Sequence, residues 1–210
     1  MCTQKISKLS LVNAYFFHYL QRYMHYKYRN IKYNIYANLP NTIVELGPGV
    51  GSNMRYYKQN TTLLAIEPNL GMHHLLQKSA QKYKVNLEIL NLYADKLPFA
   101  NSTIDTIVCS LVLCTVEDPI LVLNEIKRVL KPGGKFIFLE HVEANKGTLL
   151  KWIQDKLHYP WHWFFEGCNL NRDTYNTLID AGFSNLKIEK LSLKTIFFPI
   201  RPHIYGIASK

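Results

Sequence analysis

Short apolar segments alternate with amphipathic ones through the middle of the chain. The apolar segments have the length and the β-branched content of buried strands, and they cover residues 42–46, 62–67, 86–91, 104–113 and 134–142. The stretches between them predict helices at residues 52–58, 70–83 and 118–130. Strands that alternate with helices at this interval predict βαβ units and a parallel sheet.

This alternation of strands and helices ends after residue 142. We expect a helix at 147–158, then the aromatic run PWHWFFEGCNL at 160–170, and a helix at 172–181 that stops at Gly182. Two strands, at 184–191 and 203–208, follow it.

The front of the chain, residues 9–37, predicts one or two helices rich in tyrosine, with Lys and Arg between the aromatic residues. One interpretation is a basic, aromatic face that lies on a membrane surface or closes over a ligand. The other is a helix packed on the domain, with tyrosine hydroxyls reaching water. The two interpretations are compatible, and both stay open.

Composition indicates one ordinary globular domain, because 48% of the 210 residues are apolar and 19% are charged. The net charge of +10 favours anionic partners, but the lysines are scattered rather than gathered in a stripe. We therefore expect no nucleic-acid partner. No apolar run reaches the roughly 18 residues that a membrane span requires.

The four cysteines, Cys2, Cys109, Cys114 and Cys168, form no C-x-x-C pair. Their spacing therefore signals neither a zinc site nor a disulfide framework. We interpret them as free thiols in a reducing compartment, and we expect a cytoplasmic protein with at most weak peripheral contact with a membrane through residues 9–37.

Polar residues and glycines gather where the predicted strands end, which is where open parallel sheets bind their ligands. After the first strand comes the sequence ELGPGVG, whose glycines allow a tight turn and a close approach of a ligand to the backbone. It is not the phosphate-binding sequence G-x-G-x-x-G, because position 52 is serine. Glu45 would repel a pyrophosphate but attract a cation, such as the ammonium group of an amino acid.

The other strands end on residues of similar chemistry. Glu67 follows the second strand at the distance where an acid can accept hydrogen bonds from a ribose diol. The later strands are followed by Asp95, by Cys109 and Ser110, and by Glu140 and His141. We expect these side chains to meet at one edge of the sheet.

The segments VELGPGVG, AIEPN, ADKLPFANSTIDTIVC and LKPGGKFIFLEHV together resemble a class I S-adenosylmethionine-dependent methyltransferase over residues 40–142. The resemblance implies S-adenosylmethionine as the cofactor. It also implies an α/β fold with a seven-stranded, mostly parallel Rossmann-like sheet covered by helices on both faces. The last two predicted strands would supply the inserted antiparallel strand.

The same resemblance assigns a part of the cofactor to each strand end. The first strand and the glycine loop would hold the methionine part, the acid after the second strand the ribose, the residues after the third strand the adenine, and those after the fourth strand the sulfonium. The implied cofactor-binding residues are Glu45, Leu46, Gly47, Pro48, Gly49, Glu67, Pro68, Ala94, Asp95, Cys109 and Ser110.

Outside this core, CSLVLCTVEDP, LEHVEAN, PWHWFFEGCNLNRDTY and RPHIYGIASK resemble the alkyl-thiol S-methyltransferases of animal microsomal membranes. This resemblance implies a small thiol, an alkyl thiol or hydrogen sulfide, as the methyl acceptor. Where that family has an apolar N-terminal anchor, we expect the aromatic and basic segment 9–37. The chain then divides into an N-terminal helical segment (1–39) and one methyltransferase domain (40–210), with residues 143–183 as an acceptor-side insertion.

The aromatic run in that insertion has two interpretations: a wall of the acceptor pocket, and an ordinary buried aromatic cluster. Its place beyond the fifth strand, above the sheet edge, favours the wall. The side chains expected to form this wall are Trp161, Trp163, Phe164 and Phe165.

Methyl transfer to a thiol requires a thiolate, and a free thiol with a pKa of about 8.5 is mostly protonated at neutral pH. Asp95 is the first candidate for a base, because it lies at a strand end near the cofactor, and partial burial would raise its pKa and help it in this role. His141 is the second candidate. The positive charge of the cofactor alone is a third explanation. The cofactor is already activated, so we expect no metal, and Cys114 and Cys168 are interpreted as small buried residues rather than a covalent relay.

Other functions share this core. A quinone C-methyltransferase or a lipid-amine N-methyltransferase would differ only after residue 142. An inactive cofactor-binding module is disfavoured by the complete set of motifs. A nucleic-acid methyltransferase is disfavoured because no catalytic Asn-Pro-Pro-aromatic sequence occurs. The sequence leaves the oligomeric state open.

Overall fold

The computed structural model describes residues 7–210. It begins with one long helix, α1 (Lys8–Ile35), which is capped by the hydroxyl of Ser7 accepting a hydrogen bond from the Ser10 amide. The tyrosine-rich segment is therefore a single helix. Cys2 lies outside the described residues.

The first part of the fold alternates strands and helices as the sequence predicts. Its elements are β1 (Thr42–Leu46), the 3₁₀ turn η1 (Met54–Tyr56), β2 (Thr62–Ile66), α2 (Leu70–Tyr83), β3 (Asn86–Leu90), β4 (Ile104–Ser110), α3 (Pro119–Val129) and β5 (Leu130–His141). The second part consists of α4 (Leu149–Phe164), α5 (Thr174–Asp180), β6 (Lys187–Ser192), the 3₁₀ turn η2 (Phe198–Ile200) and β7 (Pro202–Ser209).

The strands form one seven-stranded sheet in the order β3-β2-β1-β4-β5-β7-β6. Strands β1 to β5 pair in parallel, and β7 is antiparallel to both of its neighbours, β5 and β6. The predicted fold class, a mostly parallel sheet with an inserted antiparallel strand from the C-terminal pair, is confirmed.

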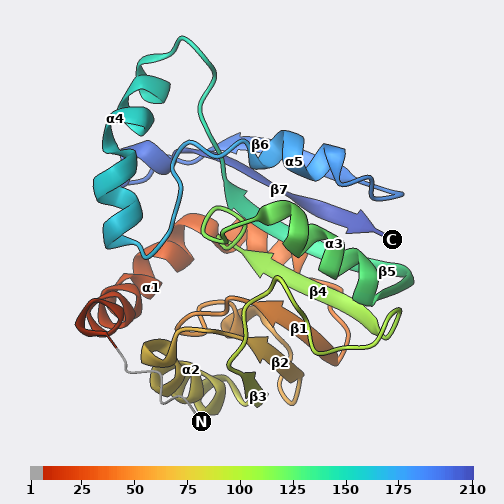
Figure 1. Ribbon diagram of the computed structural model, residues 1–210. Coiled ribbons are helices and arrows are strands. Elements are labelled where there is room, and N and C mark those ends of the chain that lie inside the picture. Colours follow the sequence, from red (N-terminus) through yellow and green to blue (C-terminus); the bar gives the residue numbers. More distant parts are fainter. Residues whose placement is uncertain (1–6) are drawn as a thin grey trace.

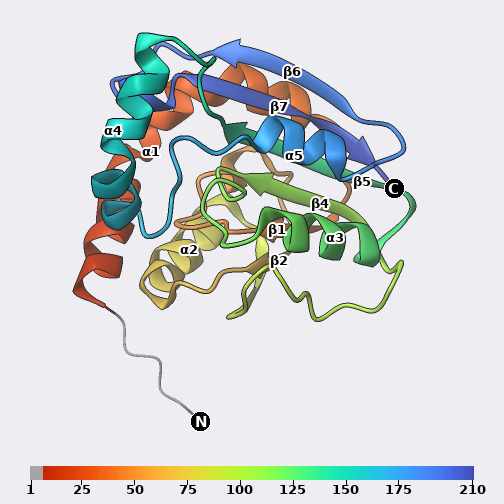
Figure 2. The same ribbon diagram turned by 45° about the horizontal axis from the view of Figure 1, so that its top comes forward.

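Helices cover both faces of the sheet (Figures 1 and 2). Helices α3 and α5 lie on one face, where Leu123, Ile126 and Leu178 pack on the sheet in one hydrophobic core. Helix α2 and the second half of α1 cover the other face, where Tyr28 and Leu76 belong to a second core. Burial on both sides explains why the central strands are apolar almost throughout.

Several boundaries differ from the sequence prediction. The helix expected at 52–58 is only the short turn η1, and β4 ends at Ser110, three residues early, because Leu111 takes a left-handed conformation with φ +61°. Strand β5 starts at Leu130, because this residue pairs with Ile104 ahead of a register shift.

Helix α4 is longer than predicted. It runs through Pro160 to Phe164, so the first half of the aromatic run is helical. Proline removes one backbone donor and normally ends a helix, which is why the sequence favoured an earlier end. Among the described residues, no helix is long and apolar enough to cross a membrane.

Candidate functional site

The carboxyl ends of β1, β4 and β5 meet at the edge of the sheet that faces α1 and α4 (Figure 1). Helix α1 runs along this edge and contacts it repeatedly. Near its start, Asn13 donates to the carbonyl of Phe164 in α4, and in its middle Gln21 donates to the carbonyl of Val50 in the glycine loop. The predicted site residues therefore lie beneath α1, the helix for which the sequence left two interpretations open.

In the glycine loop after β1, Gly47 and Gly49 both adopt a left-handed backbone conformation. Gly47 has φ +56°, and a Cβ there would lie 2.5 Å from a methyl carbon of Val112. Gly49 has φ +58°, and a Cβ there would meet nothing within 4 Å. The backbone at Gly49 thus borders open space, as expected where a ligand comes close to the main chain.

Glu45 is fully buried at the end of β1. Its carboxylate accepts hydrogen bonds from Asn53 Nδ2 at 2.6 Å and from the Tyr57 hydroxyl at 2.8 Å. Burial raises the pKa of Glu45 to about 7, although both hydrogen bonds and the charge of Lys32 act in the opposite direction. Glu45 is therefore poised between its neutral and ionised forms near neutral pH.

Lys32 of α1 is the nearest partner of this network. Its ammonium group donates to Asn53 Oδ1 at 2.5 Å, and burial lowers the pKa of Lys32 to about 8. The same helix face carries Tyr36, whose hydroxyl lies 2.6 Å from Ser110 Oγ at the end of β4. The sequence analysis did not identify Lys32 or Tyr36 as site residues. The signal was the spacing of Tyr28, Lys32 and Tyr36, four residues apart and so on one helical face.

Glu67 follows β2 and joins two loops. One carboxylate oxygen accepts the Gly49 amide at 2.8 Å, and the other accepts the Asn69 amide at 2.9 Å. Burial raises the pKa of Glu67, and these two hydrogen bonds oppose that change. The acid expected to bind a ribose is thus fixed directly beside the glycine loop, with lone pairs left for further donors.

The residues assigned to the adenine and the sulfonium lie further along the same edge. Ala94 is buried after β3, whereas the side chain of Asp95 is exposed. Asp95 therefore lacks the partial burial that would help a carboxylate act as a base, and its role as a base stays a prediction. Cys109 is fully buried in β4, with its sulfur 3.5 Å from a carboxylate oxygen of Glu140.

Glu140, at the end of β5, organises the loop after β4. It is fully buried, and its carboxylate accepts the amides of Val112 at 2.9 Å, Leu113 at 3.1 Å and Cys114 at 3.4 Å. Burial raises the pKa of Glu140, while the amides of Val112 and Leu113 lower it. The sequence placed this acid at the edge but gave no sign of its role in holding a loop.

His141 lies inside the protein, with only 3% of its surface exposed. Its Nε2 atom is 3.1 Å from the sulfur of Cys168, and that sulfur is 3.8 Å from the sulfur of Cys114. The indole of Trp161 donates to Cys168 at 3.3 Å. Cys109, Cys114 and Cys168 are all buried free thiols. The second candidate base is therefore surrounded by two cysteines rather than by open space.

Three of the four aromatic residues predicted to form an acceptor wall border one apolar cavity of about 240 Å³. Trp163 does not, since it lies on the outer side of α4 with 69% of its surface exposed. The lining consists of Leu157, Pro160, Trp161, Phe164 and Phe165. From α1, Phe16 packs edge-on against the rings of Phe164 and Phe165, so the helix closes part of this aromatic cluster.

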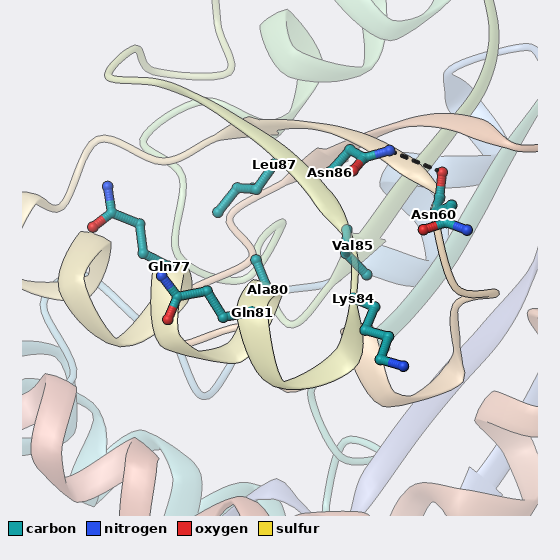
Figure 3. A pocket seen from close by; sticks show the side chains of 8 residues that line it. All are labelled: Asn60, Gln77, Ala80, Gln81, Lys84, Val85, Asn86 and Leu87. Carbon is teal, nitrogen blue, oxygen red and sulfur yellow. Dashed lines mark hydrogen bonds between the residues drawn. The ribbon is translucent and has the colours of Figure 1, made fainter.

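A larger hollow of about 580 Å³ lies elsewhere (Figure 3). It lies between the end of α2 and the start of β3, at the amino ends of the strands, and its lining is mostly amide side chains and Lys84. The side chain of Asn86 bonds there to the carbonyl of Asn60. None of the predicted site residues lines this hollow, and its lining contains no carboxylate, thiol or imidazole.

Comparison with known proteins shows to which family the chain belongs. Residues 44–138 match the methyltransferase domain family. The chain is 37% identical over 172 residues to thiol S-methyltransferase TMT1A of Homo sapiens, a match that covers 80% of this chain and 70% of that protein. It is 36% identical over 172 residues to thiol S-methyltransferase TMT1B of Rattus norvegicus, with the same shares of both chains.

The fold is also found in solved structures. A SAM-dependent methyltransferase of Methanosarcina mazei superposes with a TM-score of 0.63 over 84% of this chain and 96% of that one, at 19% sequence identity. At this identity the similarity concerns the fold. The superposition covers 84% of the chain, whereas the match to the domain family covers only residues 44–138. The similarity in fold therefore extends beyond the parallel strands.

Proposed function

Because the chain belongs to the thiol S-methyltransferase family, we propose that it transfers a methyl group from S-adenosylmethionine to the sulfur of a small thiol. The observation that carries this proposal is the 37% identity to human thiol S-methyltransferase TMT1A. That match covers 80% of the chain, so it necessarily continues past residue 138, where the domain-family match ends. It therefore includes part of the segment in which acceptor specificity is expected.

The residues at the sheet edge suit S-adenosylmethionine. Glu45 offers a buried carboxylate for the ammonium group, Glu67 offers one for the ribose hydroxyls, and Gly49, whose amide bonds to Glu67, borders open space. When bound, S-adenosylmethionine supplies an electrophilic methyl group on a sulfonium, which a thiolate attacks in line. The task of the protein is then to align the thiol and exclude water.

The lining of the predicted acceptor wall favours an apolar thiol as the methyl acceptor. The cavity bordered by Trp161, Phe164 and Phe165 is almost wholly apolar and would hold an alkyl chain rather than a charged group. In the reaction the acceptor loses its S–H proton, a carbon–sulfur bond forms, and the bond from the methyl group to the sulfonium breaks.

Neither of the two candidate bases is well placed to take the proton, since the side chain of Asp95 is exposed to solvent and His141 is buried beside two cysteines. We propose that the S–H proton of the acceptor passes to solvent and that the positive charge of the cofactor stabilises the thiolate.

Quinone C-methylation and lipid-amine N-methylation are less favoured. Both would use the same core, so the segment beyond β5 must decide between them and a thiol. The identity to two thiol S-methyltransferases extends into that segment.

We also propose a cytoplasmic location with weak contact between α1 and a membrane surface. Buried free thiols at Cys109, Cys114 and Cys168 suit a reducing compartment. Along α1, Tyr15, Tyr19 and Tyr26 are exposed, and the same helix carries Arg22, Lys27 and Arg29. Binding of the chain to anionic vesicles, and its loss on raising the salt concentration, tests this contact.

A panel of acceptors tests the proposed reaction. The purified full chain is incubated with S-adenosylmethionine and, in separate reactions, with sulfide, 2-mercaptoethanol, a longer alkyl thiol, a demethylated quinone and a lipid amine. We expect S-adenosylhomocysteine and a methylated product with the thiols, and with neither of the other acceptors. Turnover confined to the quinone or the amine, or cofactor binding without turnover on any acceptor, would overturn the proposal.

A further inference from the structure

A buried cluster of two thiols and one imidazole lies at the acceptor side of the sheet edge. Cys114 comes from the loop after β4, His141 from the end of β5, and Cys168 from the loop after α4. All three side chains are buried, and their sulfur and nitrogen atoms lie within 4.8 Å of one another. Three segments distant in sequence thus converge through the residue types that bind soft metal ions.

The distances in the cluster are close to those of a tetrahedral zinc site. With Zn–S bonds of about 2.3 Å and a Zn–N bond of about 2.05 Å, two sulfurs lie about 3.8 Å apart and a sulfur and a nitrogen about 3.6 Å apart. The sulfurs of Cys114 and Cys168 are 3.8 Å apart, and His141 Nε2 is 3.1 Å from the sulfur of Cys168. His141 Nε2 lies about half an ångström closer to the Cys168 sulfur than the tetrahedral distance, and the three ligand atoms lie within 4.8 Å of one another.

Hydrogen bonding explains the cluster poorly. Thiols are weak donors and weak acceptors, so the contacts among Cys114, His141 and Cys168 stabilise this buried cluster only weakly. A divalent ion bound to two thiolates and one neutral imidazole leaves no net charge in the interior, and metal–ligand bonds replace these weak contacts.

The loop that carries Cys114 is held rigidly from two sides. Glu140 accepts the Cys114 amide, and Asn169, next to Cys168, donates to the Cys114 carbonyl through its backbone amide at 2.8 Å and its side chain at 3.0 Å. Arg172 donates to the carbonyls of Leu113 and Val116. These contacts fix the two sulfurs relative to each other, as a metal site requires of the groups around its ligands.

We propose that Cys114, His141 and Cys168 bind one zinc ion, through two thiolates and imidazole Nε2. Three protein ligands leave a fourth coordination position for water or another small ligand. The ion joins the segment after α4 to the ends of β4 and β5. It thereby fixes Trp161, which both contacts Cys168 and borders the apolar cavity. This proposal departs from the sequence-based expectation of no metal, because the three ligands converge only in the fold.

Metal content tests the proposal without reference to catalysis, so its failure would leave the proposed methyl transfer untouched. The untagged full chain is purified under reducing conditions with zinc present, freed of loose metal and measured by inductively coupled plasma mass spectrometry. We expect one zinc per chain. After removal of zinc with a chelator, added cobalt(II) is expected to give the thiolate charge-transfer and intense visible bands of a tetrahedral site.

Variants locate the ion. Cys114→Ser and Cys168→Ser are each expected to weaken zinc binding by about 100-fold or more. Cys109→Ser is the matched control, since Cys109 is also a buried thiol but lies outside the cluster, and it is expected to keep one zinc. Circular dichroism shows whether each variant is folded.

The cobalt experiment on the unchanged chain does not depend on the folding of any variant. A cobalt(II) spectrum without thiolate bands would overturn the proposal. Equal reactivity of the thiols in zinc-treated and chelator-treated chain would do the same.

Discussion

The ammonium group of Lys32 reaches the carboxylate of Glu45 through a single amide, that of Asn53, which accepts from Lys32 at 2.5 Å and donates to Glu45 at 2.6 Å. Helix α1 is thereby connected to the residue expected to hold the ammonium end of the cofactor. All three side chains are buried. The ionisation of Glu45 therefore depends on a helix that precedes the domain core in sequence.

Replacing Lys32 tests this connection. Lys32→Met removes a positive charge that favours the ionised form of Glu45. If the pKa of Glu45 rises by about one unit, the ionised fraction at pH 7 falls about fivefold, and so does the affinity for S-adenosylhomocysteine measured by calorimetry. Affinity should recover as the pH is raised. Arg29→Met, at an exposed position of the same helix, is the control and should change neither quantity.

The cofactor affinity of the unchanged protein should depend on pH in the same sense. The pKa of Glu45 is raised to about 7, so an increase in pH ionises it and strengthens its attraction for an ammonium group. Between pH 6 and pH 7.5 the ionised fraction rises about eightfold, and we expect the association constant to follow. Glu45→Gln should bind weakly and show little of this dependence. A flat profile in the unchanged protein would contradict the assignment.

Substitution of two glycines that share a positive φ distinguishes an effect on stability from an effect on cofactor binding. Gly49→Ala and Gly133→Ala each place a Cβ at a positive φ, +58° and +76°, with no atom within 4 Å. Both should lower the free energy of unfolding by about 1–2 kcal/mol. Only Gly49→Ala, beside Glu67, should weaken cofactor binding by about tenfold or more. Thermal unfolding and calorimetry on both variants measure the two effects.

Two adjacent aromatic residues test the acceptor wall. Phe164 borders the apolar cavity, whereas Trp163 is exposed on the outer side of the same helix. Phe164→Ala should raise KM for an alkyl thiol about tenfold, because a pocket wall of this size contributes on the order of 1–2 kcal/mol. Trp163→Ala should leave KM within about twofold. Equal effects of the two substitutions would show that the cavity does not receive the acceptor.

Replacing Asp95 distinguishes deprotonation of the acceptor thiol by solvent from deprotonation by a protein base. Its side chain is exposed, so Asp95→Asn should lower turnover by less than about tenfold at saturating cofactor. Turnover of both proteins should rise with pH as the thiol ionises. A loss of about 100-fold or more, with cofactor binding preserved, would restore Asp95 as the base.

The sequence predicted the architecture well because the fold depends on local periodicity. The strands and helices from β1 to β5 follow from short apolar segments separated by amphipathic ones, and the glycine loop with Glu45 and Glu67 follows from the order of the motifs. Each of these signals lies within a few residues of the element it predicts.

The rest depends on contacts between distant segments. Nothing near Lys32 indicates that it approaches Glu45, and Trp163 has the same character as Phe164 until the helix phase of α4 is known. Cys114, His141 and Cys168 are separated by 27 residues or more, and only the convergence of three loops brings them together. Chemistry of this kind has no local pattern to recognise.

The position of β7 has a consequence for how the chain folds. Strand β6 pairs with β7 and, within residues 7–210, with no other strand, while β7 alone joins this pair to β5. The two strands follow each other in sequence, so they can form as a local hairpin and then dock on the parallel sheet along one seam. The backbone amides along that seam should report a separate opening event in hydrogen exchange, distinct from unfolding of the five parallel strands.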